Sequence, residues 1–437
     1  MTTRPGLTSI HCPFVRRILI PGMAAVALLW GGGALSGCGA ASLADERGLG
    51  DLAPERMKAI TVSLQDAVER GDVGGVVTLI YRRGEIARVD AVGWQDEART
   101  KPMARDSIFR IASMTKPITS VAALILVDEG KLALDDPVDR WLPELADPTV
   151  LRDPTDPLDS GSPSPRPIRV VDLLTHRSGI VTPRTAPGPL LDALTQADAG
   201  NAAGYDRWIE WIGALPLAHV PGTTFNYGNS VDVLGILVER VSGKTLPDFL
   251  RQRIFEPLGM NDTAFFIPPE KRSRAARLQS LGRVPASWIP ADTEVPNFVS
   301  AAGGLYSTVD DYLKFSRMLL GGGQLGDVRI LERGTVDRMT TNQLSSEQLT
   351  RSPFGAEAGD WKGQGFGLGL AVKDDTGVKA RELGIASPGS FGWPGVFGTW
   401  WEADPKQDMI LIFMVPGGDS KPARWTFQAG AYRAIDH

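Results

Sequence analysis

Ser113 and Lys116 are the residues best suited to covalent chemistry, and they form the only Ser-x-x-Lys in the chain. An apolar helical pattern follows them directly. Residues three apart lie on one face of a helix, so the lysine amine can reach the serine hydroxyl. A serine becomes a nucleophile when a neighbouring base takes its proton, and a helix N-terminus favours the negative charge that then develops. The spacing alone is weak, because a helix cap followed by a solvated lysine gives the same pattern.

Tyr227 and Asn229 form a second group, in a Pro-Gly turn that leads into another helical pattern. A tyrosine hydroxyl placed by such a turn could move a proton between a nucleophile and a leaving group. An asparagine amide could bind an acyl carbonyl. The alternatives are a packing role for the tyrosine ring and a capping role for the asparagine.

Trp393, Gly395 and Val396 belong to a third group, the glycine-rich stretch 392–399, which is predicted to enter a strand. Glycine lets another backbone or a ligand approach closely. The backbone N–H of Val396 could therefore pair with that of Ser113 to bind an oxyanion. The alternative is an ordinary strand entry without a catalytic role.

Other catalytic signatures are absent or weaker. The sequence contains no Gly-x-Ser-x-Gly, no Walker A loop and no His-Glu-x-x-His. His176 could suggest a Ser-His-Asp triad, but it lies in a predicted turn, which suits a structural role better. The chain has four histidines and two cysteines, so we expect no metal site, and no organic cofactor is implied.

Elements from both ends of the chain must position these groups. The N-terminal part predicts a helix, an antiparallel hairpin and a second helix, over 54–69, 75–81 with 86–92, and 118–130. Residues 147–168 predict a surface loop, and the stretch from 170 to about 350 is mostly helical, including 231–241 and 309–320. Strands return at 367–373, 396–402 and 409–415, before a closing helix at 423–435.

This order favours an α/β (α+β) fold. An antiparallel sheet built from both termini and flanked by helices would face a helical lobe, with the site in the crevice between them. With 437 residues, of which 43% are hydrophobic and 22% charged, the chain has the composition of a folded soluble protein. Its net charge of -5 offers no basic surface for nucleic acid. The oligomeric state stays open.

The first residues predict an export signal. Arg16 and Arg17 precede an apolar run over 18–35, and small residues lead to Cys38. A membrane-spanning helix is the alternative, but a Pro-Gly pair and a run of glycines interrupt the apolar stretch. The sequence Leu-Ser-Gly-Cys resembles the bacterial lipobox. That resemblance implies lipidation of Cys38 and a membrane-anchored location in a bacterial cell envelope, periplasmic or at the outer membrane.

The three groups, in this order, resemble the motifs of the serine hydrolases that include class C β-lactamases, D-alanyl-D-alanine carboxypeptidases and family VIII carboxylesterases. Four further stretches match, at 132–142, 173–179, 256–260 and 300–308. The resemblance implies a β-lactamase/penicillin-binding-protein-like fold. It also implies that Ser113 is acylated, that Lys116 and Tyr227 form the base and proton relay, and that Asn229 contacts the acyl group. The backbone of Ser113 and Val396 would bind the oxyanion.

The domain organisation follows from the signal and the resemblance together. Residues 1–37 are expected to be a lipoprotein signal peptide, 38–53 a tether, and 54–437 the hydrolase domain. Within that domain we expect a sheet lobe at about 54–112 and 360–437, and a helical lobe at about 113–359.

Trp393 departs from the β-lactamase pattern. The third motif of β-lactamases is Lys-Thr-Gly, whose cation holds a substrate carboxylate, whereas this chain has Trp-Pro-Gly. Losing that charge-assisted bond removes an anchor of about 1.5 to 3 kcal/mol. We therefore expect a serine carboxylesterase for short-chain or neutral small-molecule esters. The alternatives are a β-lactamase or D-amino-acid peptidase that cleaves cell-wall-related substrates, including amides, and a non-catalytic cell-wall-binding lipoprotein.

Overall fold

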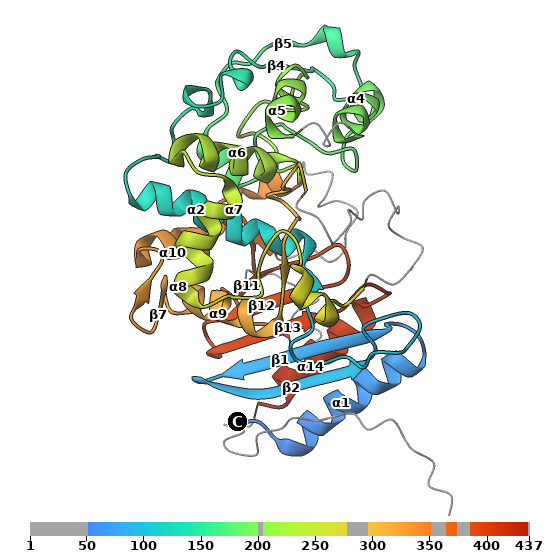
Figure 1. Ribbon diagram of the computed structural model, residues 1–437. Coiled ribbons are helices and arrows are strands. Elements are labelled where there is room, and N and C mark those ends of the chain that lie inside the picture. Colours follow the sequence, from blue (N-terminus) through green and yellow to red (C-terminus); the bar gives the residue numbers. More distant parts are fainter. Residues whose placement is uncertain (1–50, 200–203, 278–295, 351–363, 374–384, 436–437) are drawn as a thin grey trace, which may run out of the picture. The chain divides into compact units, whose positions relative to one another are not determined.

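The computed structural model describes residues 51–199, 204–277, 296–350, 364–373 and 385–435 (Figure 1). The predicted signal peptide, Cys38 and most of the predicted tether lie outside these residues. Residues 51–53 of the tether are part of the fold, because Leu52 is buried against Ile435 and the N–H of Ala53 donates to Ala434 at 2.8 Å. No helix within the described ranges combines the length and apolar content that a bilayer crossing requires.

A seven-stranded antiparallel sheet contains strands from both ends of the chain, in the order β2-β1-β13-β12-β11-β10-β9. The central pairing joins β1 to β13, with Val77 opposite Met414 and Arg82 opposite Met409. The predicted fold class is therefore confirmed. The strands are β1 (Gly75–Arg82), β2 (Glu85–Gly93), β9 (Gln364–Phe366), β10 (Ala371–Lys373), β11 (Phe391–Pro394), β12 (Trp400–Asp404) and β13 (Met409–Met414).

Two predicted strand boundaries are wrong. The stretch 367–373 is not one strand, because Gly369 adopts a φ of 92° and the chain turns there between β9 and β10. The stretch 396–402 does not begin a strand either. Strand β11 ends at Pro394, a tight turn follows in which the N–H of Gly395 donates to Thr399 at 2.7 Å, and β12 begins only at Trp400. The third motif therefore leaves a strand rather than entering one.

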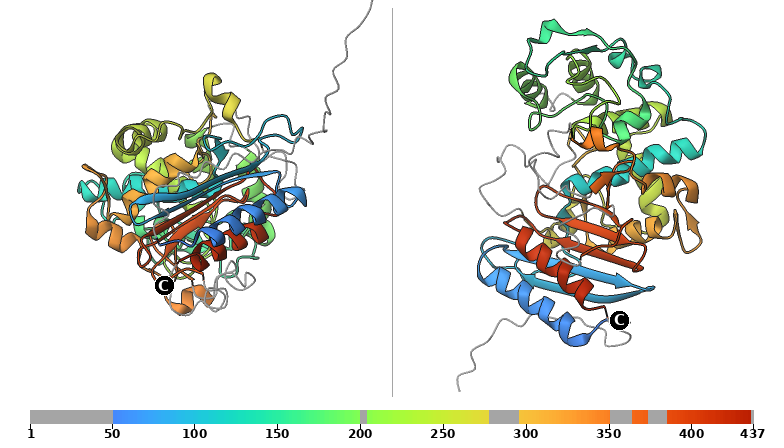
Figure 2. Two further views of the ribbon diagram at one scale, coloured as in Figure 1. Left: turned by 90° about the horizontal axis from the view of Figure 1, so that it is seen from below. Right: turned by 180° about the vertical axis from the view of Figure 1, so that it is seen from behind.

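Helices cover both faces of the sheet. Helices α1 (Pro54–Glu69) and α14 (Lys421–Arg433) lie side by side on one face, and α9 (Val309–Leu320) packs against the other (Figure 2). Strand β13 shows why, since alternate side chains point to opposite faces of a strand. Leu411 and Phe413 pack in the core under α1 and α14, whereas Ile410 and Ile412 belong to the core on the α9 side.

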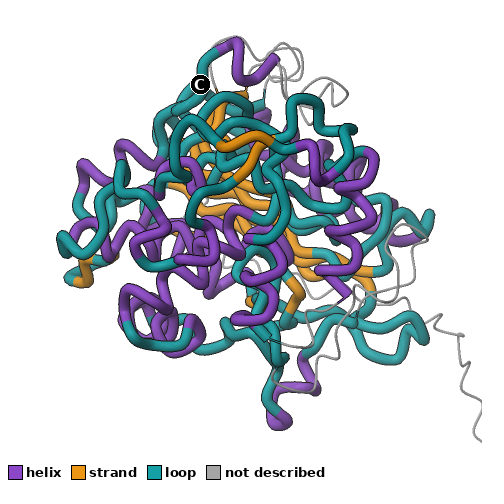
Figure 3. Tube along the Cα trace, turned by 90° about the horizontal axis from the view of Figure 1, so that it is seen from above, coloured by secondary structure: helices purple, strands orange, loops and turns teal. Residues whose placement is uncertain are grey.

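The middle of the chain is helical, as predicted. Helix α2 (Thr115–Asp128) is buried from Thr115 to Leu126, because it contacts α6 (Ser230–Ser242) and α7 (Leu246–Leu250). In Figure 3, which is coloured by secondary structure, helices lie on both sides of the strands. The remaining α-helices of the described part are α3 (Val170–Leu174), α4 (Gly188–Ala199), α5 (Tyr205–Gly213), α8 (Glu256–Leu258), α10 (Arg333–Met339) and α11 (Ser346–Thr350). The loop 147–168 contains only the short strands β4 (Thr149–Val150) and β5 (Ser162–Pro163) and one 3-10 turn, Leu158–Ser160.

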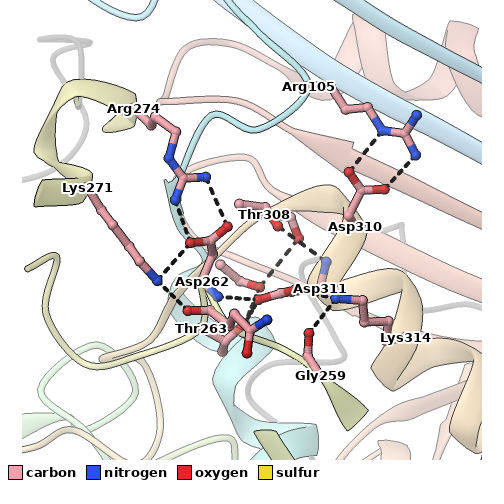
Figure 4. A network of polar contacts seen from close by, with 12 residues as sticks. Arg105, Gly259, Asp262, Thr263, Lys271, Arg274, Thr308, Asp310, Asp311 and Lys314 are labelled. Carbon is pink, nitrogen blue, oxygen red and sulfur yellow. Dashed lines mark hydrogen bonds and ion pairs between the residues drawn. The ribbon is translucent and has the colours of Figure 1, made fainter. Parts of the chain in front are cut away.

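A network of carboxylates fastens the chain after α8 to helix α9 (Figure 4). Asp311 of α9 is buried, and its carboxylate accepts the backbone N–H of Asp262 at 2.6 Å and the hydroxyl of Thr263 at 3.1 Å. The Arg274 guanidinium pairs with Asp262 and, as the largest cause, lowers the pKa of that carboxyl to about 2. Thr308 directly follows strand β6 (Tyr306–Ser307), and its side chain caps α9 by accepting the backbone N–H of Asp311. The network around Asp311 therefore also holds the end of β6.

Candidate active site

Ser113 lies in a 3-10 turn, Ala112–Met114, between strand β3 (Phe109–Arg110) and helix α2. Strand β3 pairs with β6, so the carboxylate network described above supports the strand that leads to Ser113. Ala112 adopts a φ of 46°, a conformation that costs a non-glycine residue roughly 1–3 kcal/mol. Contacts on both sides hold it, since Thr399 donates to the carbonyl of Ile111 at 3.2 Å and Tyr312 donates to the carbonyl of Met114 at 2.9 Å.

Lys116 and Tyr227 both contact the Ser113 hydroxyl. The distance from Lys116 Nζ to Ser113 Oγ is 3.2 Å, and the distance from the Tyr227 hydroxyl to Ser113 Oγ is 2.9 Å. Lys116 Nζ also lies 4.6 Å from the centre of the Tyr227 ring. The structure thus brings together residues that are 114 positions apart in the sequence, as the motifs predicted.

Lys116 is buried and is held from behind by a short chain of contacts. Its Nζ donates to the carbonyl of Ala302 at 2.8 Å, and the N–H of Ala302 donates to Asp232 Oδ1 at 3.0 Å. The Ser300 hydroxyl donates to the same carboxylate oxygen at 2.9 Å. Burial raises the pKa of Asp232, and the positive charge of Lys116 opposes that rise. A buried carboxylate therefore fixes the backbone that receives the lysine.

Trp393 contributes to the site through Tyr227. The indole N–H of Trp393 donates to the Tyr227 hydroxyl oxygen at 3.4 Å, and the two rings lie 5.4 Å apart. Trp393 is only 3% exposed and packs with Phe225 and Phe366. The indole occupies the position predicted from the third motif, and it provides a neutral donor and an apolar wall there.

The turn after β11 lies directly against the nucleophile turn. A Cβ atom on Gly395 would lie 2.5 Å from the carbonyl oxygen of Ile111 and 2.2 Å from the hydroxyl of Thr399, so only glycine fits. Val396, the next residue, has a side chain that is 45% exposed. The contact of Gly395 with Ile111 therefore brings the residue before Val396 against the chain two residues before Ser113.

Asn229 stands at the start of α6 without capping it. Its side chain makes no capping hydrogen bond, and its amide nitrogen is buried without a partner among the described residues. The capping alternative considered from the sequence is therefore not what the structure shows. The Asn229 amide nitrogen is thus a buried donor without a partner in the described part of the chain, two residues from Tyr227.

His176 is not part of a triad with Ser113. Its Nδ1 accepts the backbone N–H of Gly228 at 3.2 Å, and its ring packs against Tyr227. No group of three or more His, Cys, Asp or Glu side chains suited to a metal ion occurs in the described part of the chain.

The sequence analysis missed Asp232, Ala302 and Thr399. Asp232 did leave a signal, because it is an acidic residue among Val231, Val233 and Leu234 on a helix whose apolar side must face the core. Ala302 left none, since it acts through a backbone carbonyl that every residue has. Thr399 belongs to the matched third motif, but its hydroxyl contact with Ile111 depends on the fold.

A Ser–Lys–Tyr group joined by hydrogen bonds, beside an antiparallel sheet, defines a serine hydrolase of the Ser-x-x-Lys type. Residues 61–431 match the Beta-lactamase family model, and the chain belongs to that family. The chain is 42% identical over 357 residues to an uncharacterized protein of Mycobacterium tuberculosis, covering 81% of this chain and 88% of that protein. It is 30% identical over 361 residues to esterase EstB of Burkholderia gladioli, covering 78% and 85%.

A solved structure of EstCE1, described as a hydrolase with promiscuous acyltransferase activity, is similar with a TM-score of 0.70 at 25% identity. The match covers 87% of this chain and 98% of that one. These similarities confirm the family resemblance stated from the motifs. The protein is an esterase-like serine hydrolase.

Proposed function

We propose that the protein hydrolyses neutral, short-chain carboxylic esters through an acyl-enzyme on Ser113. The observation that carries this proposal is the Ser113 hydroxyl between Lys116 and Tyr227, with the Trp393 indole beside the tyrosine, at the motif position where β-lactamases have a lysine. The similarity of this chain to EstB, which is an esterase, supports ester chemistry.

Acylation begins when Ser113 Oγ attacks the ester carbonyl carbon. The Lys116–Tyr227 pair enters this step with one of its two groups deprotonated and takes the serine proton. The bond between the carbonyl carbon and the alcohol oxygen then breaks, and the pair returns the proton to that oxygen. Lys116 Nζ lies 4.6 Å from the centre of the tyrosine ring, and the Trp393 N–H donates to the tyrosine oxygen, so both groups stand beside the phenol that handles the proton. The alcohol then leaves and the acyl group stays on Ser113.

Deacylation repeats these steps with water. A water molecule attacks the acyl carbonyl, the same pair takes its proton, and the bond from the carbonyl carbon to Ser113 Oγ breaks as the serine recovers the proton. In both steps the backbone N–H groups of Ser113 and Val396 bind the carbonyl oxygen as it gains negative charge. The Asn229 amide binds the acyl side of the substrate.

A direct comparison of substrates tests this proposal. Initial rates are measured for p-nitrophenyl acetate, p-nitrophenyl butyrate and a chromogenic cephalosporin with the same preparation. We expect ester turnover with little cephalosporin turnover. Cephalosporin turnover that exceeds ester turnover would overturn the ester assignment and indicate a β-lactamase, and turnover of neither substrate would contradict the proposal.

A Trp393→Lys variant tests why charged substrates are excluded. The new cation restores a charge-assisted bond, so the ratio of kcat/KM for a carboxylated β-lactam to kcat/KM for a neutral ester should rise by about 10-fold or more. Trp393→Met is the matched control, because it removes the indole without adding charge. The explanation fails if the lysine and methionine variants show the same ratio.

We further propose that Cys38 anchors the protein to an envelope membrane. The support is the apolar run that ends in Leu-Ser-Gly-Cys. In a bacterial host, Cys38→Ala is expected to move the protein from the membrane to the soluble fraction and to remove the mass of the acyl chains. A variant that stays in the membrane fraction with the mass shift of the lipid intact would contradict this.

A further inference from the structure

His176 is a buried residue for which the proposed mechanism has no role. It is fully buried, and its backbone φ is 52°, in the left-handed region that residues other than glycine seldom adopt. A strained residue of this kind persists only where surrounding contacts hold it, and such residues concentrate at functional sites.

His176 accepts hydrogen bonds from the two residues that flank Tyr227. The backbone N–H of Asn226 donates to the carbonyl oxygen of His176 at 2.9 Å. The backbone N–H of Gly228 donates to Nδ1 of its imidazole at 3.2 Å. One residue therefore binds the chain directly before and directly after the tyrosine.

The imidazole ring also contacts the tyrosine ring itself. The two ring centres lie 4.6 Å apart with an interplanar angle of 45°. On another side the His176 ring meets Phe366 edge-on at 5.5 Å. The imidazole therefore packs directly against the ring of Tyr227.

The loop that carries Tyr227 lies in close contact with the 176–181 segment. A Cβ atom on Gly228 would lie 2.4 Å from the carbonyl oxygen of Ile180, so the tyrosine loop follows the 176–181 segment at the closest possible distance. The Thr185 hydroxyl donates to the carbonyl oxygen of Tyr227 at 3.2 Å and adds a contact from the same side.

The imidazole is neutral in this position. Burial, and to a smaller extent the positive charge of Lys116, hold the pKa of His176 well below its usual value. Since Nδ1 accepts a hydrogen bond, we assign the ring proton to Nε2. His176 therefore offers an acceptor to Gly228 without placing a second positive charge beside Lys116.

We propose that His176 is a positioning residue for Tyr227. It fixes the backbone on both sides of the tyrosine and the plane of its ring, and so sets the phenol oxygen 2.9 Å from Ser113 Oγ. The inference rests on the proposed function, because it gives Tyr227 the task of relaying a proton.

His176→Gly and His176→Asn separate this role from a general structural one. Glycine tolerates the backbone angle but removes the acceptor and the ring. Asparagine also tolerates the left-handed region, and its carboxamide oxygen falls near the place of Nδ1. With p-nitrophenyl butyrate, we expect the glycine variant to lose about 10- to 100-fold in kcat with KM nearly unchanged, and the asparagine variant to recover most of that loss.

The deciding measurement repeats His176→Gly in a Tyr227→Phe background. If His176 acts through the tyrosine hydroxyl, the substitution should change kcat by less than about twofold there. An equal loss in both backgrounds would overturn the inference and leave the proposed function intact. Full activity of Tyr227→Phe itself would instead overturn both. If the glycine variant does not fold, His176→Gln is used in its place, because the longer glutamine side chain carries its carboxamide oxygen beyond the N–H of Gly228. A kcat of His176→Gln equal to that of His176→Asn would then contradict the proposal.

Discussion

Replacing Ser113 by alanine is expected to lower kcat/KM for p-nitrophenyl butyrate by about 10⁴-fold or more. The covalent route disappears with the hydroxyl, and only binding and the oxyanion donors remain to accelerate attack by water. Ser113 is the one residue between 111 and 120 that is not buried, so its hydroxyl is the group on this turn that a substrate can reach. Steady-state kinetics with the purified variant measures the loss.

Ser120→Ala is the matched control for this variant. Ser120 lies on the same helix and is fully buried, and its hydroxyl has no partner within the described residues. The control is expected to keep kcat/KM within about threefold of the parent. Comparable losses in the two variants would show that the helix, and not the Ser113 hydroxyl, had been damaged.

Replacing Lys116 by methionine is expected to reduce kcat by about 10³-fold, and replacing Tyr227 by phenylalanine by about 10²-fold. Methionine fills the buried space of the lysine stem but leaves the Ala302 carbonyl without its donor. Phenylalanine keeps the ring against His176 and Trp393 and removes only the oxygen next to Ser113. Steady-state and burst kinetics with p-nitrophenyl butyrate report both losses.

The size of the combined loss separates a shared role from two independent roles. If Lys116 and Tyr227 transfer the same proton, the double variant should lose little more than Lys116→Met alone. Lys131→Met is the control, since Lys131 is an exposed residue that follows the same helix. Losses that multiply in the double variant would contradict the shared relay.

The motifs predicted that Ser113, Lys116 and Tyr227 come together because they combine local spacing with residue chemistry. Ser113 and Lys116 are one helical turn apart, and the helix periodicity brings them to one face. The resemblance then added Tyr227, whose contact with Ser113 no local rule could supply. The hairpin at 75–93 and helix α1 were predicted almost to the residue, because each has a clear period and end signals.

The parts that were missed depend on long-range contacts. Ala302 binds Lys116 across 186 residues of sequence and is itself held by Asp232 across 70, and a backbone carbonyl carries no pattern in the sequence. The start of β12 was placed too early, at Val396, because Val396 and Phe397 have strand propensity, whereas the Gly395–Thr399 hydrogen bond closes a turn there. His176 was expected to be a structural turn residue. Its place against Tyr227 became visible only in the fold.

The most direct test of the central claim is the site of covalent labelling. The protein is incubated with a p-nitrophenyl alkylphosphonate, which reacts with an activated serine and stays attached, and the digest is analysed by mass spectrometry. We expect one adduct per chain, on Ser113, that forms in parallel with the loss of esterase activity and is absent from Ser113→Ala. An adduct on another residue, or inactivation without a covalent adduct, would contradict an acyl-enzyme on Ser113.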